Sequence, residues 1–201
     1  MAAEQEKRAL TRLDAADLAA ARAHAALAAE PAARIAACRT APEALAALIE
    51  AGFLLEATRL IAYALPHREA VWWACMCARH TTPPDLPDPD RAALETAEEW
   101  VRKQSDETRR AAMEHAQRSN FASPEAWTGV AAFWSGDSMA PLGQHKVPPA
   151  PHLAGTAVAG AVHLASVRAD PARAPKRLAA FIESARAIAA GAAGRLAPEI
   201  P

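Results

Sequence analysis

Apolar residues, most of them alanine, recur every three or four positions along most of this chain of 201 residues. This spacing gives a helix one apolar face, and alanine is the strongest helix former. Glycine occurs only 8 times, and β-branched residues do not alternate with polar ones as they do in strands. The sequence therefore predicts an all-α protein.

Prolines and capping residues mark where the expected helices begin. Proline is favoured in the first helical turn, and Asp or Ser just ahead of an apolar run can cap the first amides. Pro42, Pro66 and Pro124 stand at such points. The expected helices span residues 14–30, 32–39, 43–50, 53–65, 67–80, 89–104, 106–119, 124–135, 152–168 and 175–193.

The connections between several of these helices are only two or three residues long. The junctions at Gly52, Pro66 and Ser105 therefore force neighbouring helices into tight hairpins or sharp corners. A chain of 201 residues is long enough for one core but short for two. We predict a compact orthogonal bundle of about 8–10 helices. A solenoid is the alternative, because the Trp72-Trp73 segment has a loose echo around Trp127.

The domain boundaries follow from the same pattern. We expect residues 1–201 to form a single helical domain, with mobile ends at 1–12 and 194–201. The last segment contains glycine and proline, which fray a helix end.

The charge balance excludes several classes of partner. The 22 Lys and Arg and the 23 Asp and Glu give a net charge of -1, so we do not expect nucleic acid to bind. The first eight residues contain several charges, unlike a secretory signal. The longest weakly charged apolar run, residues 152–167, is shorter than the roughly 20 residues of a spanning helix. We expect a cytoplasmic protein without a membrane span.

The stretch "PHREAVWWACMCARH", residues 66–80, contains the residue types of a metal site. On a helix, however, Cys75 and Cys77 lie roughly 160° apart around the axis and cannot hold one ion. Cys77 and His80 share a face but supply only half of a structural zinc site. We therefore predict no metal and no cofactor. Apolar residues on all sides of this helix indicate that it is buried at the centre.

Catalytic residues are not predicted either. Ser135 and Ser138 in "SGDS", followed by His145, have the residue types of a hydrolase but no supporting spacing. The chain has no Gly-x-Ser-x-Gly, no phosphate-binding glycine loop and no His-Glu-x-x-His helix. A small helical enzyme or metal-binding protein with a site near Ser135–His152 remains the alternative function.

The long connection "SGDSMAPLGQHKVPPAPHLAG" is the strongest candidate for an interaction site. It has four prolines, which lower the entropic cost of an extended shape, and few charges. Two interpretations are open: an internal strap across the domain, and a segment that docks on a protein partner. The expected partner-binding residues are Trp127, Trp134, Leu142, His145, Val147 and His152.

Three segments together resemble an uncharacterised bacterial helical family whose members are encoded near type VI secretion genes. These segments are "REAVWWACMCAR", "SPEAWTGVAAFWSGDSMAP" and "VPPAPHLAGTAVAGAVHLAS", and the resemblance covers about residues 40–168. It implies an accessory role beside that machine, as adaptor or chaperone for a loaded component, and it supplies no catalytic residues. The expected function is therefore a non-enzymatic protein–protein interaction.

Overall fold

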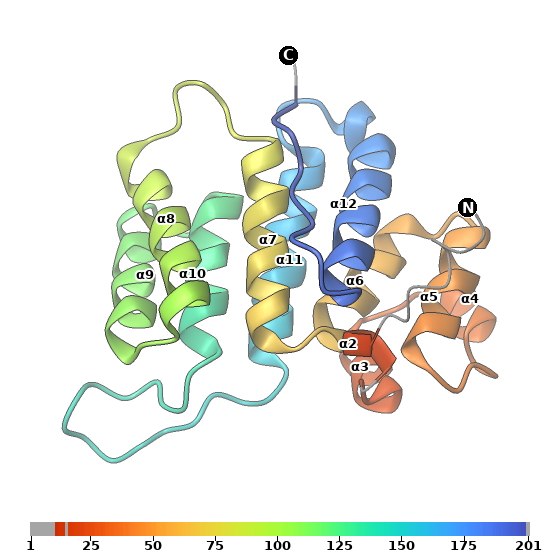
Figure 1. Ribbon diagram of the computed structural model, residues 1–201, viewed down its shortest axis with the longest axis horizontal. Coiled ribbons are helices and arrows are strands. Elements are labelled where there is room, and N and C mark those ends of the chain that lie inside the picture. Colours follow the sequence, from red (N-terminus) through yellow and green to blue (C-terminus); the bar gives the residue numbers. More distant parts are fainter. Residues whose placement is uncertain (1–10, 15, 200–201) are drawn as a thin grey trace.

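The computed structural model describes residues 11–14 and 16–199, and every regular element in this part of the chain is a helix (Figure 1). This confirms the all-α fold class. The N-terminal elements are α2 (Thr11–Asp14), α3 (Leu18–His24), α4 (Ala29–Arg34), α5 (Ala41–Glu50) and α6 (Leu54–Ala64). The longer helices follow: α7 (His67–His80), α8 (Asp88–Lys103), α9 (Asp106–Arg118), α10 (Pro124–Trp134), α11 (Leu153–Val167) and, after the 3-10 turn η1 (Pro171–Arg173), α12 (Ala174–Ala189).

The helices pack around α7, which lies near the middle of the molecule. In Figure 1, α8, α9 and α10 stand on one side of α7 and α12, α6 and α5 on the other, with α11 behind. Helix α10 contacts α7, α8, α9 and α11, and α11 also contacts α6 and α12. In a solenoid each unit would touch only its neighbours along the chain. The structure is therefore the compact bundle and not the solenoid alternative.

Helix α7 is the buried central helix that the sequence predicted. Val71, Trp73, Cys75 and Cys77 are fully buried. The indole nitrogen of Trp73 donates a hydrogen bond to the carbonyl of Phe181 in α12 (2.8 Å). This bond satisfies the only polar atom of the buried tryptophan side chain.

The predicted helix at 14–30 is wrong, because the chain forms two helices there. Asp17 caps α3 by accepting a hydrogen bond from the amide of Ala20 (3.1 Å), and Ala26 adopts a left-handed conformation with φ 49° after α3 ends. The prediction placed Pro31 between helices at 14–30 and 32–39, but Pro31 lies within α4; a helix continuous from α3 into α4 would bring its ring against the carbonyl of Leu27. The break places Pro31 in the first turn of α4, where proline is tolerated.

Glycines let α10 and α11 approach their neighbours closely. A Cβ added to Gly129 of α10 would lie 2.6 Å from the carbonyl oxygen of Ala112 in α9. One added to Gly155 of α11 would lie 2.4 Å from the ring of Tyr63 in α6. Both positions therefore require a residue without a side chain.

A buried ion pair joins the ends of three helices. Glu125, at the start of α10, is fully buried and accepts hydrogen bonds from both terminal nitrogens of Arg168, one of them at 2.8 Å. Arg168 follows α11 and also donates to the carbonyl of Thr81, just after α7 (3.0 Å). A buried charge is tolerated only with partners of this kind.

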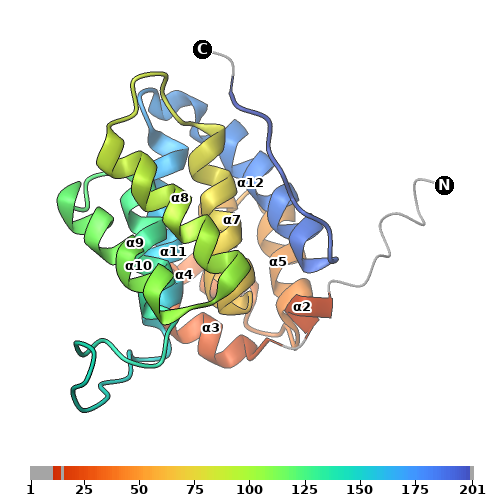
Figure 2. The same cartoon turned by 60° about the vertical axis from the view of Figure 1, so that its left-hand side comes forward.

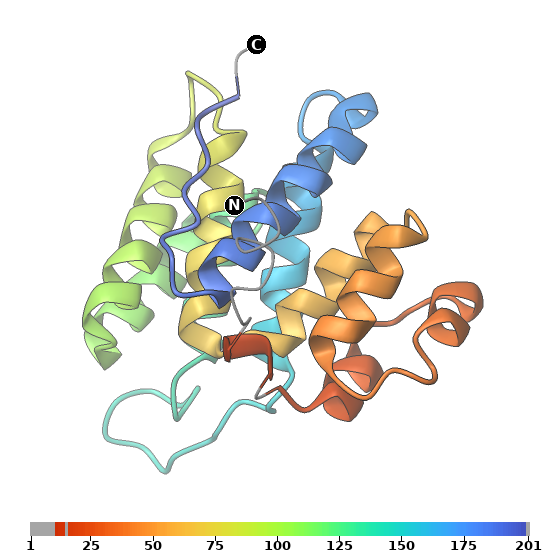
Figure 3. The same ribbon diagram turned by 45° about the vertical axis from the view of Figure 1, so that its right-hand side comes forward.

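The C-terminal residues run back along the bundle, between α7 and α12 (Figure 3). The carbonyl of Ala193 accepts a hydrogen bond from the indole of Trp72 (2.7 Å), and the amide of Glu199 donates to the carbonyl of His80 (2.7 Å). The Glu199 carboxylate accepts from Arg177 (2.6 Å). Of the two ends expected to be mobile, 1–12 and 194–201, residues of the segment 194–199 make hydrogen bonds to the bundle, whereas residues 1–10, 200 and 201 lie outside the described residues.

The helices in the described part of the chain are all too short or too polar to cross a membrane.

Candidate partner-binding loop

The connection at residues 135–151 leaves the bundle between α10 and α11 and projects away from it (Figures 1 and 2). Residues 141–148 are all exposed, with Leu142 76% and Val147 48% exposed. Among the described residues, Phe121 is the only other large hydrophobic residue that is exposed. The tip of the loop therefore does not lie across the domain's own surface as a strap.

The loop is closed at its base by backbone hydrogen bonds. The amide of Met139 donates to the carbonyl of Val147 (2.7 Å). The hydroxyl of Ser138, which is buried, accepts from the amides of Val147 (3.0 Å) and Ala140 (3.2 Å). An ion pair between Lys146 and Asp137 crosses the same base. Closed ends of this kind make a loop compact and limit its shapes.

Arg109 of α9 supports the base from inside the bundle. Its side chain is only 3% exposed, and it donates to the carbonyl of Phe133 near the end of α10 (3.3 Å). Its guanidinium lies 5.2 Å from the centre of the Phe133 ring and forms an ion pair with Asp106. A Cβ on Gly136 would lie 2.3 Å from the Nε of Arg109, so glycine lets the loop pass the arginine.

Sequence reasoning missed both Arg109 and the structural role of Ser138. Helix α9 is so rich in charged residues that one buried arginine does not stand out in its sequence. Ser138 was considered only as a hydrolase residue. Its position just after the end of α10 was the available signal, because serine commonly binds nearby backbone amides in turns.

The structure separates the six predicted partner-binding residues into groups. Leu142, His145 and Val147 are exposed in the loop, and Trp134 lies half-buried at the end of α10. Trp127 lies two helical turns earlier, about 10 Å along the axis.

Trp127 and His152 make contacts with other parts of the bundle. The Trp127 indole donates to the carbonyl of Phe121 (3.0 Å), and its ring lies 3.6 Å from the position of a Cβ on Gly160. The ring of His152 stacks on that of His24 in α3, 4.4 Å between centres. The exposed part of the predicted site is thus the tip of the loop.

The bonding of the two serines does not favour a nucleophile in this loop. The Ser135 hydroxyl donates to the carbonyl of Ala131 (2.7 Å), and the Ser138 hydroxyl accepts from the two amides described above.

The cysteines of α7 are not reactive thiols either. Burial raises the pKa of the Cys75 and Cys77 thiols well above the ordinary value, so both stay protonated. No group of three or more His, Cys, Asp or Glu in the described part of the chain is placed to hold a metal ion.

Comparison with known proteins gives a family and no function. No curated protein and no solved structure matches the chain. The model of a family of unknown function, DUF6931, matches residues 44–189. This range includes α6 to α12 and the whole loop at 135–151. Because the match covers well over half of the sequence, the chain belongs to the DUF6931 family.

Proposed function

We propose that this protein is a non-enzymatic, cytoplasmic interaction protein that holds a protein partner with the tip of the loop at residues 135–151. The observation that carries the proposal is the exposure of Leu142 and Val147, two of the three large hydrophobic side chains classed as exposed among the described residues. Covering such side chains is favourable by about 25 cal/mol per Å² of apolar surface. Two of them in one projecting loop favour a partner with an apolar pocket.

The closed base makes the loop suited to binding. Its hydrogen bonds between Met139, Ser138 and Val147 fix the two ends of the tip before a partner arrives. The loop therefore loses less conformational freedom when a partner binds. His145 and Lys146 lie beside the apolar side chains and would form the polar rim of the interface.

We further propose that the partner is a component of a type VI secretion machine, for which the protein acts as adaptor or chaperone. The support is the resemblance of three segments to proteins encoded near type VI secretion genes. Two of these segments, residues 123–141 and 147–166, flank the tip of the loop.

The test is a double substitution, Leu142→Ser with Val147→Ser, in the full chain. Capture of the partner from the native host should fall at least tenfold, because a central apolar contact commonly contributes more than about 1.4 kcal/mol. The helical circular-dichroism signal and the melting temperature should stay nearly unchanged, because exposed positions change stability by only about 0.5 kcal/mol. Phe121→Ser removes the third exposed hydrophobic side chain and serves as the matched control.

A photo-crosslinking residue at position 142 identifies the partner, with the exposed Ala46 of α5 as the control position. A crosslink that forms from 142 and not from 46 supports the loop as the binding site. Unchanged capture by the double variant would reject the interaction proposal. A crosslinked protein outside the secretion machine would reject the type VI assignment alone.

A further inference from the structure

A pocket of about 450 Å³ lies where the start of α7, the end of α8 and the turn after α12 meet. It is lined by Arg12, Arg68, Glu69, Trp72, Val101, Arg102, Ile188, Arg195 and the turn at 191–193. Its volume is within the range of small-molecule sites, about 300–1,000 Å³. None of its residues belongs to the loop at 135–151.

The lining is strongly basic, although the whole chain has a net charge of -1. The lining contains four arginines and one carboxylate, Glu69. The nearest oxygen of Glu69 is 3.6 Å from the Nε of Arg12 and 3.8 Å from an Nη of Arg68. The side chains of Arg102 and Arg195 are exposed and form no hydrogen bond and no ion pair with another described residue. The pocket therefore has positive charge that the protein itself does not neutralise.

Two of the arginines are already held in position. Arg12 donates to the carbonyl of Ile188 at the end of α12 (2.7 Å), and Arg68 donates to the carbonyl of Val101 at the end of α8 (2.8 Å). Each of these bonds uses one nitrogen of the guanidinium and leaves other donors for a ligand. The planar guanidinium fits the geometry of phosphate and carboxylate groups.

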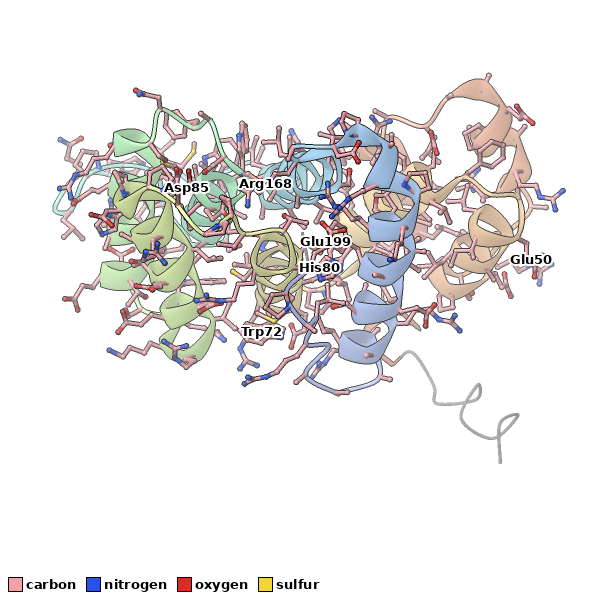
Figure 4. All side chains as sticks on the ribbon, turned by 90° about the horizontal axis from the view of Figure 1, so that it is seen from above. Glu50, Trp72, His80, Asp85, Arg168 and Glu199 are labelled. Carbon is pink, nitrogen blue, oxygen red and sulfur yellow. The ribbon has the colours of Figure 1, made fainter. Side chains whose placement is uncertain are left out.

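The pocket also has an apolar part. Trp72 lies half-buried on the side of α7 that faces the C-terminal residues, where its indole nitrogen binds the carbonyl of Ala193 (Figure 4). With this nitrogen engaged, Trp72 presents only apolar surface to a ligand, next to Val101 and Ile188. A small inorganic anion would leave this surface uncovered.

We propose that this pocket binds a small organic phosphate, whose phosphate groups lie among the arginines and whose planar ring lies against Trp72. Four arginines and one glutamate leave an excess of three positive charges, which suits a ligand with two or more negative charges. A nucleoside phosphate combines such charge with a flat ring that stacks on tryptophan.

Calorimetric titration of the full chain with ATP, AMP, pyrophosphate and citrate tests the proposal at low salt. ATP should bind more tightly than pyrophosphate, which has the charge but no ring. The double variant Arg102→Gln with Arg195→Gln should bind ATP at least tenfold more weakly. Arg39→Gln with Arg118→Gln removes the same charge from exposed positions outside the pocket and should leave the affinity unchanged.

Trp72→Ala separates the two parts of the site. It should weaken ATP and AMP and leave pyrophosphate binding unchanged, in protein whose circular-dichroism signal confirms folding. The proposal is overturned if none of the phosphates binds, if both double variants lose the same affinity, or if citrate binds as tightly as ATP. The last result would identify a carboxylate ligand, including an acidic peptide, in place of a phosphate.

Discussion

Trp72 and Trp73 are adjacent in the sequence and lie in different environments. Trp73 is fully buried and donates to the carbonyl of Phe181, whereas Trp72 is half-buried and lines the arginine pocket. Successive residues on a helix point about 100° apart, so Trp73 faces the core, whereas Trp72 faces the end of α12 and the C-terminal residues. One side chain stabilises the fold and its neighbour is available to a ligand.

Replacing Trp73 with alanine should destabilise the protein by roughly 3–5 kcal/mol, because it leaves a large cavity in the core. Urea unfolding monitored by circular dichroism measures this loss. Trp73→Phe, which keeps a ring and loses the hydrogen bond, should cost less. A Trp73→Ala variant no less stable than Trp72→Ala would contradict the central position of Trp73.

Residue-level roles were only partly predictable from the sequence. The apolar sequence of α7 predicted that this helix is buried, which the structure confirms. It did not distinguish Trp72 from Trp73, because that difference depends on where the distant residues 181 and 193 pack. The predicted site residue His152 stacks on His24, a contact between segments 128 residues apart that no local pattern encodes.

At the scale of the helices, two glycines of similar sequence context have different surroundings. A Cβ on Gly129 would lie 2.6 Å from a backbone oxygen of α9, whereas one on Gly160 would meet only the Trp127 ring at 3.6 Å, an ordinary contact. Gly129→Ala should therefore destabilise the protein by roughly 1–3 kcal/mol through overpacking. Gly160→Ala should stabilise it by up to about 1 kcal/mol through helix propensity. Thermal unfolding compares the two, and equal effects would contradict the close packing of α9 and α10.

The C-terminal residues should contribute stability that depends on pH. The hydrogen bond from Arg177 is the main reason that the pKa of Glu199 is lowered from its ordinary value of 4.5. Since the unfolded chain binds this proton more readily, the contribution is complete above pH 4.5 and is lost as the pH falls through the lowered pKa. The melting temperature of the wild type should therefore fall more steeply on acidification than that of Glu199→Gln.

Glu183→Gln is the control for this measurement, because Glu183 is exposed on α12 and its carboxylate pairs with Arg186 of the same helix. Its acid dependence should follow the wild type. If Glu199→Gln and the wild type lose stability in parallel, Glu199 does not hold the C-terminal residues in solution.

The positions of helices were predictable where nearby residues, such as a proline at the first turn, determine where a helix begins. The range 67–80 predicted for α7 matches the structure, because Pro66 and the following apolar run define it. The helices predicted at 14–30 and 32–39 were wrong, because Pro31 was expected to separate them, whereas the chain breaks between His24 and Ala29 and Pro31 lies in the first turn of α4. The course of the loop at 135–151 was left open, since whether a proline-rich segment lies on the domain depends on packing that sequence does not specify.

For the whole molecule, we expect no stabilising metal ion. The described residues include no suitable group of ligands, and the buried core is large enough to stabilise a domain of this size. A chelator such as EDTA should leave the melting temperature unchanged. Stoichiometric zinc in purified protein, with a lower melting temperature after its removal, would contradict this expectation.

The all-α class follows from an apolar spacing that recurs along most of the chain, and so the sequence predicted it. The arginine pocket could not be predicted, because its residues come from four separate parts of the chain: residue 12, residues 68–72, residues 101–102 and residues 188–195. Those arginines resemble solvated surface charges in the sequence. Only the packing of α2, α7, α8 and α12 with the C-terminal residues brings them to one place.

The hydrogen bond between Met139 and Val147 has a consequence for how the family can diverge. Since these two residues meet at the base, the number of residues between them can change without moving α10 or α11. Doubling the length of a flexible loop costs only about 0.6 kcal/mol. Insertions, deletions and grafted peptides should therefore be accepted at 140–146, and related proteins can acquire new binding preferences there while the rest of the fold is inherited unchanged.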